Sequence, residues 1–376
     1  MATYKSIKYV IPVEVVEHSD SINALSDVDT VTTPPGDYQI LVWSAADSKW
    51  YPGYVEDITG TQKAIFAFGK TASDSFTNIS NLVSSAGVVA TDTTGVGTAR
   101  DDPSAAGFGG DKAIFGFGGS GVIYNWTNHN ITNLVSNTGV MATDTTGVGT
   151  TRQQSAASSF GGDKAIFGFG QGGSFYERTF TNVTNLVSNT GVVASDTTGV
   201  GTARCGVAAS RYGADKALFG FGVLSFGGFN YTNVTNLVSN SGVVATDTTG
   251  VGTVRANLAA ASYGGDKAIF GFGLFYNRID AYNGQQVRTN VTNLVSNTGV
   301  VATDQTGVGT GRANIAASGY GGDKAIFAYG SSGGGYSATY LSTSNLVSNA
   351  GVVASDTTGV GTVKDSLAAA GFSTTA

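Results

Sequence analysis

Six aspartates recur at nearly regular intervals and are the first candidates for chemistry in this sequence. They are Asp92, Asp144, Asp196, Asp247, Asp304 and Asp356. In most copies a Thr-Thr-Gly-Val-Gly turn follows, where a carboxylate could either bind Ca²⁺ or accept hydrogen bonds from the backbone N–H groups of its own turn. Calcium needs about six to eight oxygen ligands, and each turn offers one carboxylate. We therefore predict that these aspartates are structural and that the chain holds no metal.

A basic residue follows each of these aspartates eight positions later. The six are Arg100, Arg152, Arg204, Arg255, Arg312 and Lys364. An Asp-Lys pair such as Asp266-Lys267 also recurs, and the two sets together could form a ring of charges around a channel. We favour ion pairs between repeats and fixation of turns. The Gly-Gly-Asp-Lys sequence is no phosphate loop, because the lysine is not followed by Ser or Thr and no helix begins there.

Groups that could carry catalysis are scarce. The chain has two histidines, His18 and His129, and one cysteine, Cys205. A metal site rich in histidine cannot be built from these, and a nucleophile paired with histidine has few candidate partners. We interpret His129 as an exposed loop residue. Cys205 stands where other repeats have Asp, Gln or Ala, so we interpret it as incidental. We predict no enzymatic activity and no cofactor.

A repeated stretch indicates the fold. Lys-Ala-Ile-Phe-Gly-Phe-Gly or a close copy occurs six times, beginning at Lys63, Lys112, Lys164, Lys216, Lys267 and Lys324. Each repeat contains four short apolar runs separated by Gly, Asn and Asp turns, which predicts four antiparallel strands and no helix. Four-stranded units repeated about every fifty residues are typical of β-propellers. We predict an all-β protein with a six-bladed propeller.

The strand pattern also predicts packing and closure. Alternation places Ala and both Phe of Lys-Ala-Ile-Phe-Gly-Phe on one face, with Ile and Gly on the other. A strand rich in alanine precedes each copy except the first. A last such strand, at residues 366–372, has no copy after it. We predict that this strand completes the first blade.

Residues 1–59 stand outside the repeat, which occupies residues 60–376. Residues 9–16 read as a strand, and residues 38–44 and 50–55 as a hairpin containing Trp43 and Trp50. A module this small has little core of its own, so we expect it to lean on another domain or on a partner chain.

Composition excludes several functions. The chain has 376 residues, 41% of them hydrophobic and 12% charged, with a net charge of −6. This content is too apolar for a disordered chain, and the acidic balance makes nucleic acid an unsuitable partner. The N-terminal residues include no apolar run long enough for a signal peptide or a membrane span. We therefore expect a soluble chain made in a cytoplasm, without membrane insertion.

The links between the second and third strands differ among repeats and gather on one face of a propeller. Aromatic and charged residues in these links are candidates for recognising a glycan or a protein. The candidates are Tyr124, Trp126, Phe175, Tyr176, Phe229, Tyr276, Arg278, Tyr282, Arg288 and Tyr336. The longest link, residues 274–292, is our first choice for a contact loop. The alternative is that the links vary without constraint and that their aromatics pack on the outer strands.

One repeat resembles the kelch type. A basic residue, Arg255, precedes the small-residue strand with Ala259 and Ala260, and an aromatic strand with Phe270 and Phe272 then ends in Gly. Kelch repeats normally carry paired glycines after the second strand and a Trp in the fourth. Here only Gly118-Gly119 gives such a pair, and Val-Val-Ala-Thr occupies the fourth strand. The resemblance implies the architecture and leaves function open.

The ends of the chain and the repeats resemble structural proteins of tailed-phage virions, notably tail fibres. The similar segments are residues 23–29, 36–43 and 48–53, together with Thr-Asn-Leu-Val-Ser-Asn-Thr-Gly-Val-Val-Ala-Thr-Asp-Thr-Thr-Gly-Val-Gly-Thr. The resemblance implies a virion protein made in the host cytoplasm. Residues 1–59 would attach it to other virion proteins or oligomerise it, and the propeller would bind a host-surface receptor or glycan.

Two other hypotheses remain open at this point. The first is a capsid decoration or fibre-base protein whose propeller contacts only other virion proteins. The second is a glycan-degrading propeller, which would need clustered carboxylates in its channel.

Overall fold

The computed structural model describes residues 40–44, 49–53, 61–73, 75–122, 125–174, 177–225, 230–278, 284–334 and 338–375. The chain divides into two compact units, Met1–Asp57 and Ile58–Ala376. In the first unit, β1 (Ile40–Ser44) and β2 (Lys49–Gly53) form an antiparallel hairpin, with Trp43 opposite Trp50. The alternating pattern predicts this hairpin. The strand expected at residues 9–16 lies outside the described residues.

The larger unit contains six three-stranded antiparallel sheets, and no described residue is helical. We number the sheets along the chain and give each as small-residue strand, central strand and outer strand. They are sheet 1, β30 (Ala368–Phe372), β3 (Lys63–Ala67) and β5 (Ser80–Val83); sheet 2, β6 (Ser104–Phe108), β7 (Lys112–Gly116) and β10 (Thr132–Val135); sheet 3, β11 (Ala156–Phe160), β12 (Lys164–Gly168) and β15 (Thr184–Val187); sheet 4, β16 (Ala208–Tyr212), β17 (Lys216–Ser225) and β18 (Asn230–Val238); sheet 5, β19 (Ala259–Tyr263), β20 (Lys267–Gly271) and β23 (Thr292–Val295); and sheet 6, β24 (Ala316–Tyr320), β25 (Lys324–Ala328) and β28 (Ser344–Val347).

The small-residue strands lie against one another in a cyclic order. β30 contacts β6, and the series continues through β11, β16, β19 and β24 back to β30. Alanine and serine allow this close approach because their side chains are short. β30 pairs along its whole length with β3, so that Phe372 lies opposite Lys63. The predicted pairing of the C-terminal strand with the first central strand is therefore confirmed.

The expected alternation is wrong for the second aromatic residue of the central strand. Ala113 and Phe115 pack toward sheet 1, whereas Phe117 packs with Ile114 toward sheet 3. Phe117 follows the end of β7 with φ +64°, which turns its side chain to the opposite face. Its ring meets that of Phe167 at 5.1 Å. The interface between sheets 2 and 3 therefore contains an aromatic pair, which stabilises the fold beyond the burial of apolar area alone.

The predicted fourth strand is an irregular segment held to the outer strand by two isolated bridges. In sheet 1 these bridges are Ser80–Thr93 and Val83–Val89, and the other repeats have equivalents. Between them the buried side chain of Asn81 donates to Ala90 O at 3.1 Å. Ala90 N still donates to Leu82 O, but the Asn81 amide occupies the carbonyl of Ala90, so a regular ladder does not form.

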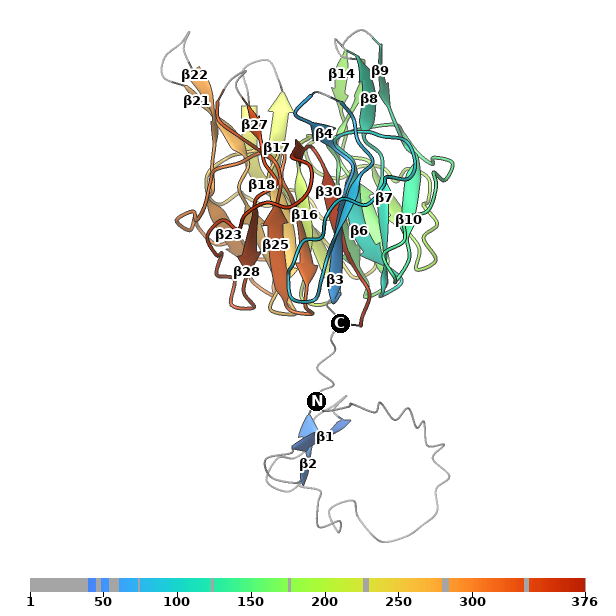
Figure 1. Ribbon diagram of the computed structural model, residues 1–376, viewed down its shortest axis with the longest axis vertical. Helices are drawn as coiled ribbons and strands as arrows, with labels where there is room; N and C mark the ends of the chain where they lie inside the picture. Colours follow the sequence, from blue (N-terminus) through green and yellow to red (C-terminus); the bar gives the residue numbers. More distant parts are fainter. Residues whose placement is uncertain are drawn as a thin grey trace. The chain divides into compact units, whose positions relative to one another are not determined.

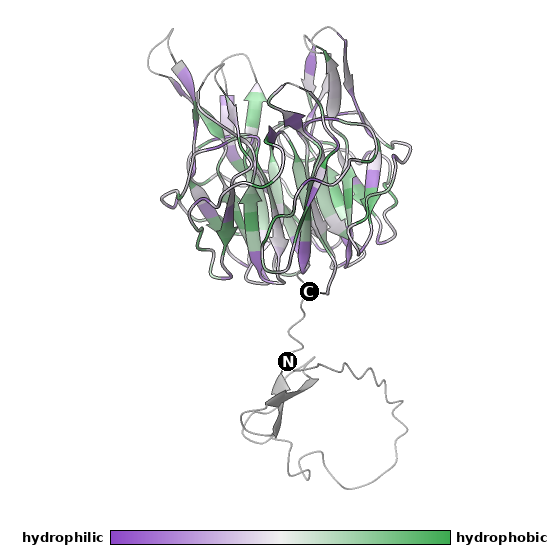
Figure 2. Cartoon of the chain, in the orientation of Figure 1, coloured by the Kyte–Doolittle hydropathy of each residue, from purple (hydrophilic) through white to green (hydrophobic). Residues whose placement is uncertain are grey.

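The variable links form hairpins on one side of the larger unit (Figure 1). They are β8 (Gly119–Val122) with β9 (Asn125–Asn128), β13 (Gln171–Gly173) with β14 (Arg178–Phe180), β21 (Leu274–Arg278) with β22 (Gly284–Arg288), and β26 (Ser331–Ser332) with β27 (Thr339–Tyr340). In sheet 1, β4 (Lys70–Thr71) pairs with β29 (Lys364–Asp365), and in sheet 4 the long strands β17 and β18 make the hairpin themselves. Figure 2 shows hydrophobic residues concentrated along the central lengths of the strands. Among the described residues, no helix is long and apolar enough to cross a membrane.

Candidate functional site

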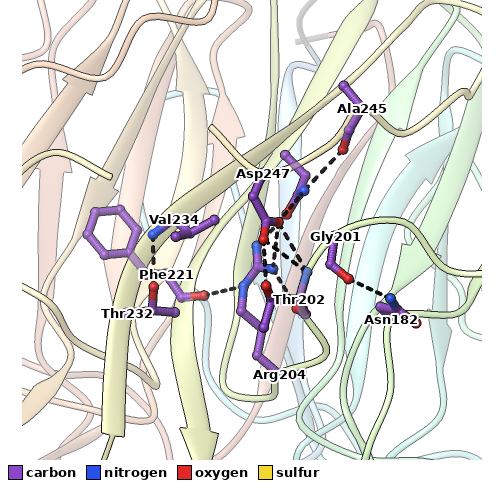
Figure 3. Close-up of polar contacts among 10 residues, drawn as sticks. Asn182, Gly201, Thr202, Arg204, Phe221, Thr232, Val234, Ala245 and Asp247 are labelled. Atoms are coloured by element: carbon purple, nitrogen blue, oxygen red, sulfur yellow. Dashed lines mark hydrogen bonds and ion pairs between the residues drawn. The ribbon is translucent and has the colours of Figure 1, made fainter. Parts of the chain in front are cut away.

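The basic residue of each repeat is fully buried and joins two neighbouring sheets. In sheet 4, Arg204 Nε donates to Phe221 O at 2.8 Å and Nη1 donates to Thr202 O at 3.0 Å (Figure 3). Its Nη2 donates to Asn236 Oδ1 at 2.7 Å. The guanidinium lies 4.2 Å from the ring centre of Phe169, which belongs to sheet 3. Burial lowers the pKa of Arg204 to about 10, so the group stays charged at neutral pH.

The repeat aspartate fastens the two ends of its sheet. Asp247 accepts hydrogen bonds from the backbone N–H and the hydroxyl of Thr202, which precedes the sheet. It also accepts one from Asn236 Nδ2 at 2.8 Å. Burial acts to raise the pKa of Asp247, but the bonds from Thr202 and Asn236 outweigh it and hold the pKa below its usual value. The predicted structural role fits these contacts, although the carboxylate caps a link 45 residues away and not its own turn.

The proposed ring of charges around a channel does not form from the basic residues. The side chains of Arg100 and its equivalents are 0% exposed and lie over aromatic rings of the preceding sheet. Each Asp-Lys pair joins two surface residues that are adjacent in the sequence. In one of them, Lys112 Nζ lies 2.6 Å from Asp111 Oδ1. Such exposed pairs contribute little to stability. The buried basic residues therefore stabilise the fold. The repeat aspartates beside them are surrounded by hydrogen-bond donors and not by metal ligands.

The residues two positions after each basic residue form a closed ring of backbone hydrogen bonds, which we call the backbone ring. Each N–H donates to the carbonyl of its counterpart in the previous repeat. The donors and acceptors are Asp102 to Ser366, Gln154 to Asp102, Gly206 to Gln154, Asn257 to Gly206, Asn314 to Asn257 and Ser366 to Asn314, at 2.7–3.2 Å. All six residues have positive φ, between 47° and 62°. The ring lies where the small-residue strands begin, on the side that carries the hairpins.

The residues one position after each basic residue differ between the two halves of this side. Each pairs with the first residue of the neighbouring link. They are Asp365, Asp101 and Gln153 in sheets 1–3, and Cys205, Ala256 and Ala313 in sheets 4–6. Cys205, Val223 and Ala256 form an apolar cluster. We call the region of sheets 1–3 the polar half. Three buried oxygens there, Asp101 Oδ1, Gln153 Oε1 and Gln171 Oε1, have no hydrogen-bond partner in the described part of the chain.

A pocket of about 650 Å³ lies over the polar half. Its wall includes aromatic and aliphatic side chains, its floor carries amides, and three charged groups surround them. These are Phe76, Val122 and Trp126; Gln153, Gln154 and Gln171; and Lys70, Asp102 and Arg178. Both the volume and the mixture of an apolar wall with a few polar groups are usual for a small-molecule site.

The wall residue Trp126 is held in place by its neighbours. Its ring lies 5.7 Å from that of Phe76, nearly perpendicular. A Cβ atom on Gly119 would lie within 2.5 Å of the indole, so only glycine lets the ring rest on β8. Trp126 Nε1 donates to Asn128 Oδ1 at 3.3 Å, and Asn128 Nδ2 donates to Gly173 O at 2.7 Å. The last bond ties the hairpins of sheets 2 and 3 together and preforms the wall.

The carboxyl groups of the polar half have raised pKa values. Burial, together with the neighbouring charge of Asp102, raises the pKa of Asp101 to about 9. Burial also raises the pKa of Asp102 to about 6, against a hydrogen bond from Gln154 that lowers it. Asp365 likewise has a raised pKa because of burial. Asp101 is therefore protonated at neutral pH.

Replacing Asp101 with asparagine is expected to raise stability at pH 8 and to change little at pH 4. Above pH about 4 an unfolded chain ionises this carboxyl while the folded chain keeps it neutral, so stability falls as pH rises toward the folded pKa near 9. Asparagine removes that cost, which is several kcal/mol at pH 8 because each pH unit between the two pKa values contributes about 1.4 kcal/mol. Urea unfolding at both pH values measures it. An equal gain at pH 4 and pH 8 would contradict ionisation as the cause.

His129 is half-buried and not exposed as expected. Its Nε2 lies 2.8 Å from Ser120 Oγ on β8, and burial lowers its pKa. The imidazole therefore supports the hairpin of sheet 2. Within the residues that the structure describes, no group of three or more His, Cys, Asp or Glu side chains could hold a metal ion.

The structure places the predicted recognition residues on the hairpins where it describes them. Trp126 lies on β9, Tyr276 and the backbone of Arg278 on β21, and Arg288 on β22. Trp126 lines the pocket, whereas Tyr276 and Arg288 are not part of its described lining. Arg288 Nη1 donates to Gly333 O and so connects the hairpins of sheets 5 and 6. The remaining candidates, Tyr124, Phe175, Tyr176, Phe229, Tyr282 and Tyr336, lie outside the described residues.

The amides of the pocket floor were not among the predicted site residues. Gln153 and Gln171 stand at repeat positions whose identities change from copy to copy. The signal was present in the sequence, since the position of Gln153 reads Asp, Gln, Cys, Ala, Ala and Asp in successive repeats. An alignment of the six copies against one another would have singled out this position.

No protein-family model and no curated protein sequence matches this chain. Its function therefore has to be argued from its own residues and their geometry.

Proposed function

We propose that the larger unit is a six-bladed, kelch-like β-propeller in which the six sheets are the blades. Three observations support this: the cyclic contacts of the small-residue strands, the backbone ring, and the pairing of β30 with β3. Face-to-face packing of successive central strands through paired aromatic rings is consistent with blades arranged around an axis.

We further propose that the protein is a non-enzymatic structural protein of a phage virion, displayed as a fibre or spike component that binds a host-surface receptor or glycan. The observation that carries this is the preformed pocket among hairpins that differ between repeats, above a scaffold whose buried Arg–Asn–Asp network recurs. A scaffold that is the same in every repeat, carrying hairpins that differ between repeats, suits a protein that recognises a ligand. Residues 1–59 attach the chain to other virion proteins and make it a homo-oligomer.

One observation favours a second function, a decoration or fibre-base protein that contacts only other virion proteins. Six equivalent valines, one per repeat, are 65–67% exposed: Val88, Val140, Val192, Val243, Val300 and Val352. They belong to the irregular fourth segments. A set of equivalent apolar side chains offers a weak contact to another protein at each repeat.

Adsorption measurements separate the two functions. Antibody fragments raised against the hairpin at residues 274–292 and against the polar half are added to intact virions carrying this chain. If the hairpin side faces outward for adhesion, the fragments bind and lower adsorption to host cells. Virions that bind neither fragment would place this side inside the particle and favour the decoration function.

A further inference from the structure

The polar half contains hydrogen-bond acceptors that the described chain leaves unused. Gln171 is 2% exposed, and neither its Oε1 nor that of Gln153 has a donor, although both residues line the pocket. A buried acceptor without a donor costs stability, so native proteins rarely keep one without a reason. Two such amides side by side in one pocket indicate a ligand that brings donors.

An aromatic wall adjoins these amides. The partly buried indole of Trp126, backed by Phe76, presents a flat apolar surface beside the amides. A ligand for this pocket therefore has an apolar face and hydroxyl groups around its rim. A pyranose ring has this combination, since its axial C–H bonds make one face apolar while its equatorial hydroxyls point outward.

We propose that this pocket binds one neutral sugar residue, with its C–H face against Trp126 and its hydroxyls donating to Gln153 Oε1 and Gln171 Oε1. Both oxygens are buried in the structure, so the two amides turn toward the pocket when the sugar binds. The inference rests on the proposed host-surface binding and names the ligand class for it. Amides that pair with sugar hydroxyls also supply selectivity, because a ligand without those hydroxyls leaves them unsatisfied.

The unpaired acceptors favour a neutral ligand over an acidic one. The unused groups are acceptors, and an anionic group cannot donate to them. Asp102 adds a carboxyl to the lining, while the charge of Lys70 acts on the carboxyls of Asp101, Asp102 and Asp365 and lowers their pKa values. The lining also carries Arg178, so its charged groups are two cations and one carboxyl, and the preference for a neutral ligand rests on the unpaired acceptors.

The asymmetry of the repeats predicts one such site among the described residues. In sheets 4 and 5 the positions equivalent to Gln153 and Gln171 hold Cys205 and Val223, then Ala256 and Leu274, which carry no amide. The expected stoichiometry is therefore one sugar per chain.

Binding by the full-length chain is measured by calorimetry and on an array of methyl glycosides that contains neutral hexosides, N-acetylhexosaminides, glucuronides and sialosides. Three variants are compared with the unaltered chain. Trp126→Ala removes the stacking surface and Gln171→Leu removes an acceptor at similar size. Tyr340→Ala changes an aromatic residue of the sheet 6 hairpin, outside the described lining of the pocket, and is the matched control.

We expect a neutral glycoside to bind one per chain, with affinity at least about tenfold lower in W126A and Q171L and unchanged in Y340A. Q171L is also expected to unfold at a higher urea concentration, because it removes the unpaired acceptor. A loss of binding in this variant would therefore not result from misfolding. Binding of acidic glycosides alone, or affinity that Q171L leaves unchanged, would overturn the proposal. Host-cell adsorption that persists in W126A and Q171L would overturn this site while leaving the adhesive function standing.

Discussion

Replacing Arg204 with alanine is expected to lower the free energy of unfolding by about 3–5 kcal/mol. The side chain is fully buried, and its removal leaves Asn236 Oδ1 and the carbonyls of Phe221 and Thr202 without their donor. It also empties the space over the Phe169 ring. Urea unfolding followed by circular dichroism measures the change.

Two control variants make this result specific. Arg204→Lys should lose less stability, because Lys364 occupies the equivalent position in sheet 1 and donates to Asn81 Oδ1 at 2.9 Å while lying over the Tyr329 ring. Lys216→Ala, which removes an exposed lysine paired with Asp215, should stay within about 0.5 kcal/mol of the unaltered chain. If R204A unfolded like K216A, the buried network would have no stabilising role.

Removing residues 366–376 is expected to abolish cooperative folding of the larger unit. The truncation deletes β30, so β3 loses its pairing along one whole edge and the core loses the buried ring of Phe372. It also removes Ser366, which takes part in two bonds of the backbone ring. An exposed strand edge and an opened core favour aggregation. Size-exclusion chromatography and thermal unfolding are the measurements.

A shorter truncation and an added peptide test whether β30 itself matters. Ending the chain at Ser373 keeps β30 and the bond from Gln62 N to Ser373 O, so folding should be retained. A synthetic peptide of residues 364–376 should restore a cooperative transition to the longer truncation, because the missing strand is short and its partner edge is specific. A longer truncation that melts like the full chain would contradict closure through β30.

The sequence predicts the strands well where side chains alternate and repeat. The central and small-residue strands follow from their period and composition, and the pairing of β30 with β3 follows from unequal counts of the two motifs. The pattern fails at Phe117, since a positive φ cannot be read from alternation. It fails at the fourth segment because the amide of a buried side chain, Asn81, occupies the carbonyl of Ala90.

The candidate site was less accessible to prediction because it depends on contacts between repeats. Trp126 was predicted from its residue type and its place in a variable link. Gln153 and Gln171 belong to different segments of sheet 3 that meet only after folding. The polar half arises because Asp365, Asp101 and Gln153 belong to sheets that become neighbours only after folding, and each of them alone is an ordinary polar residue.

The backbone ring has a consequence for the number of copies that the gene can hold. Near-identical repeats recombine unequally and gain or lose whole copies. Five of the six bonds of the ring join successive repeats, and the sixth, from Asp102 N to Ser366 O, forms only when the last repeat meets the first. A chain with five or seven copies could satisfy all its donors only by changing the angle between every pair of neighbouring repeats. Closure of the ring thus favours chains with six repeats over chains with another number. The sequences of the individual hairpins can change without affecting it.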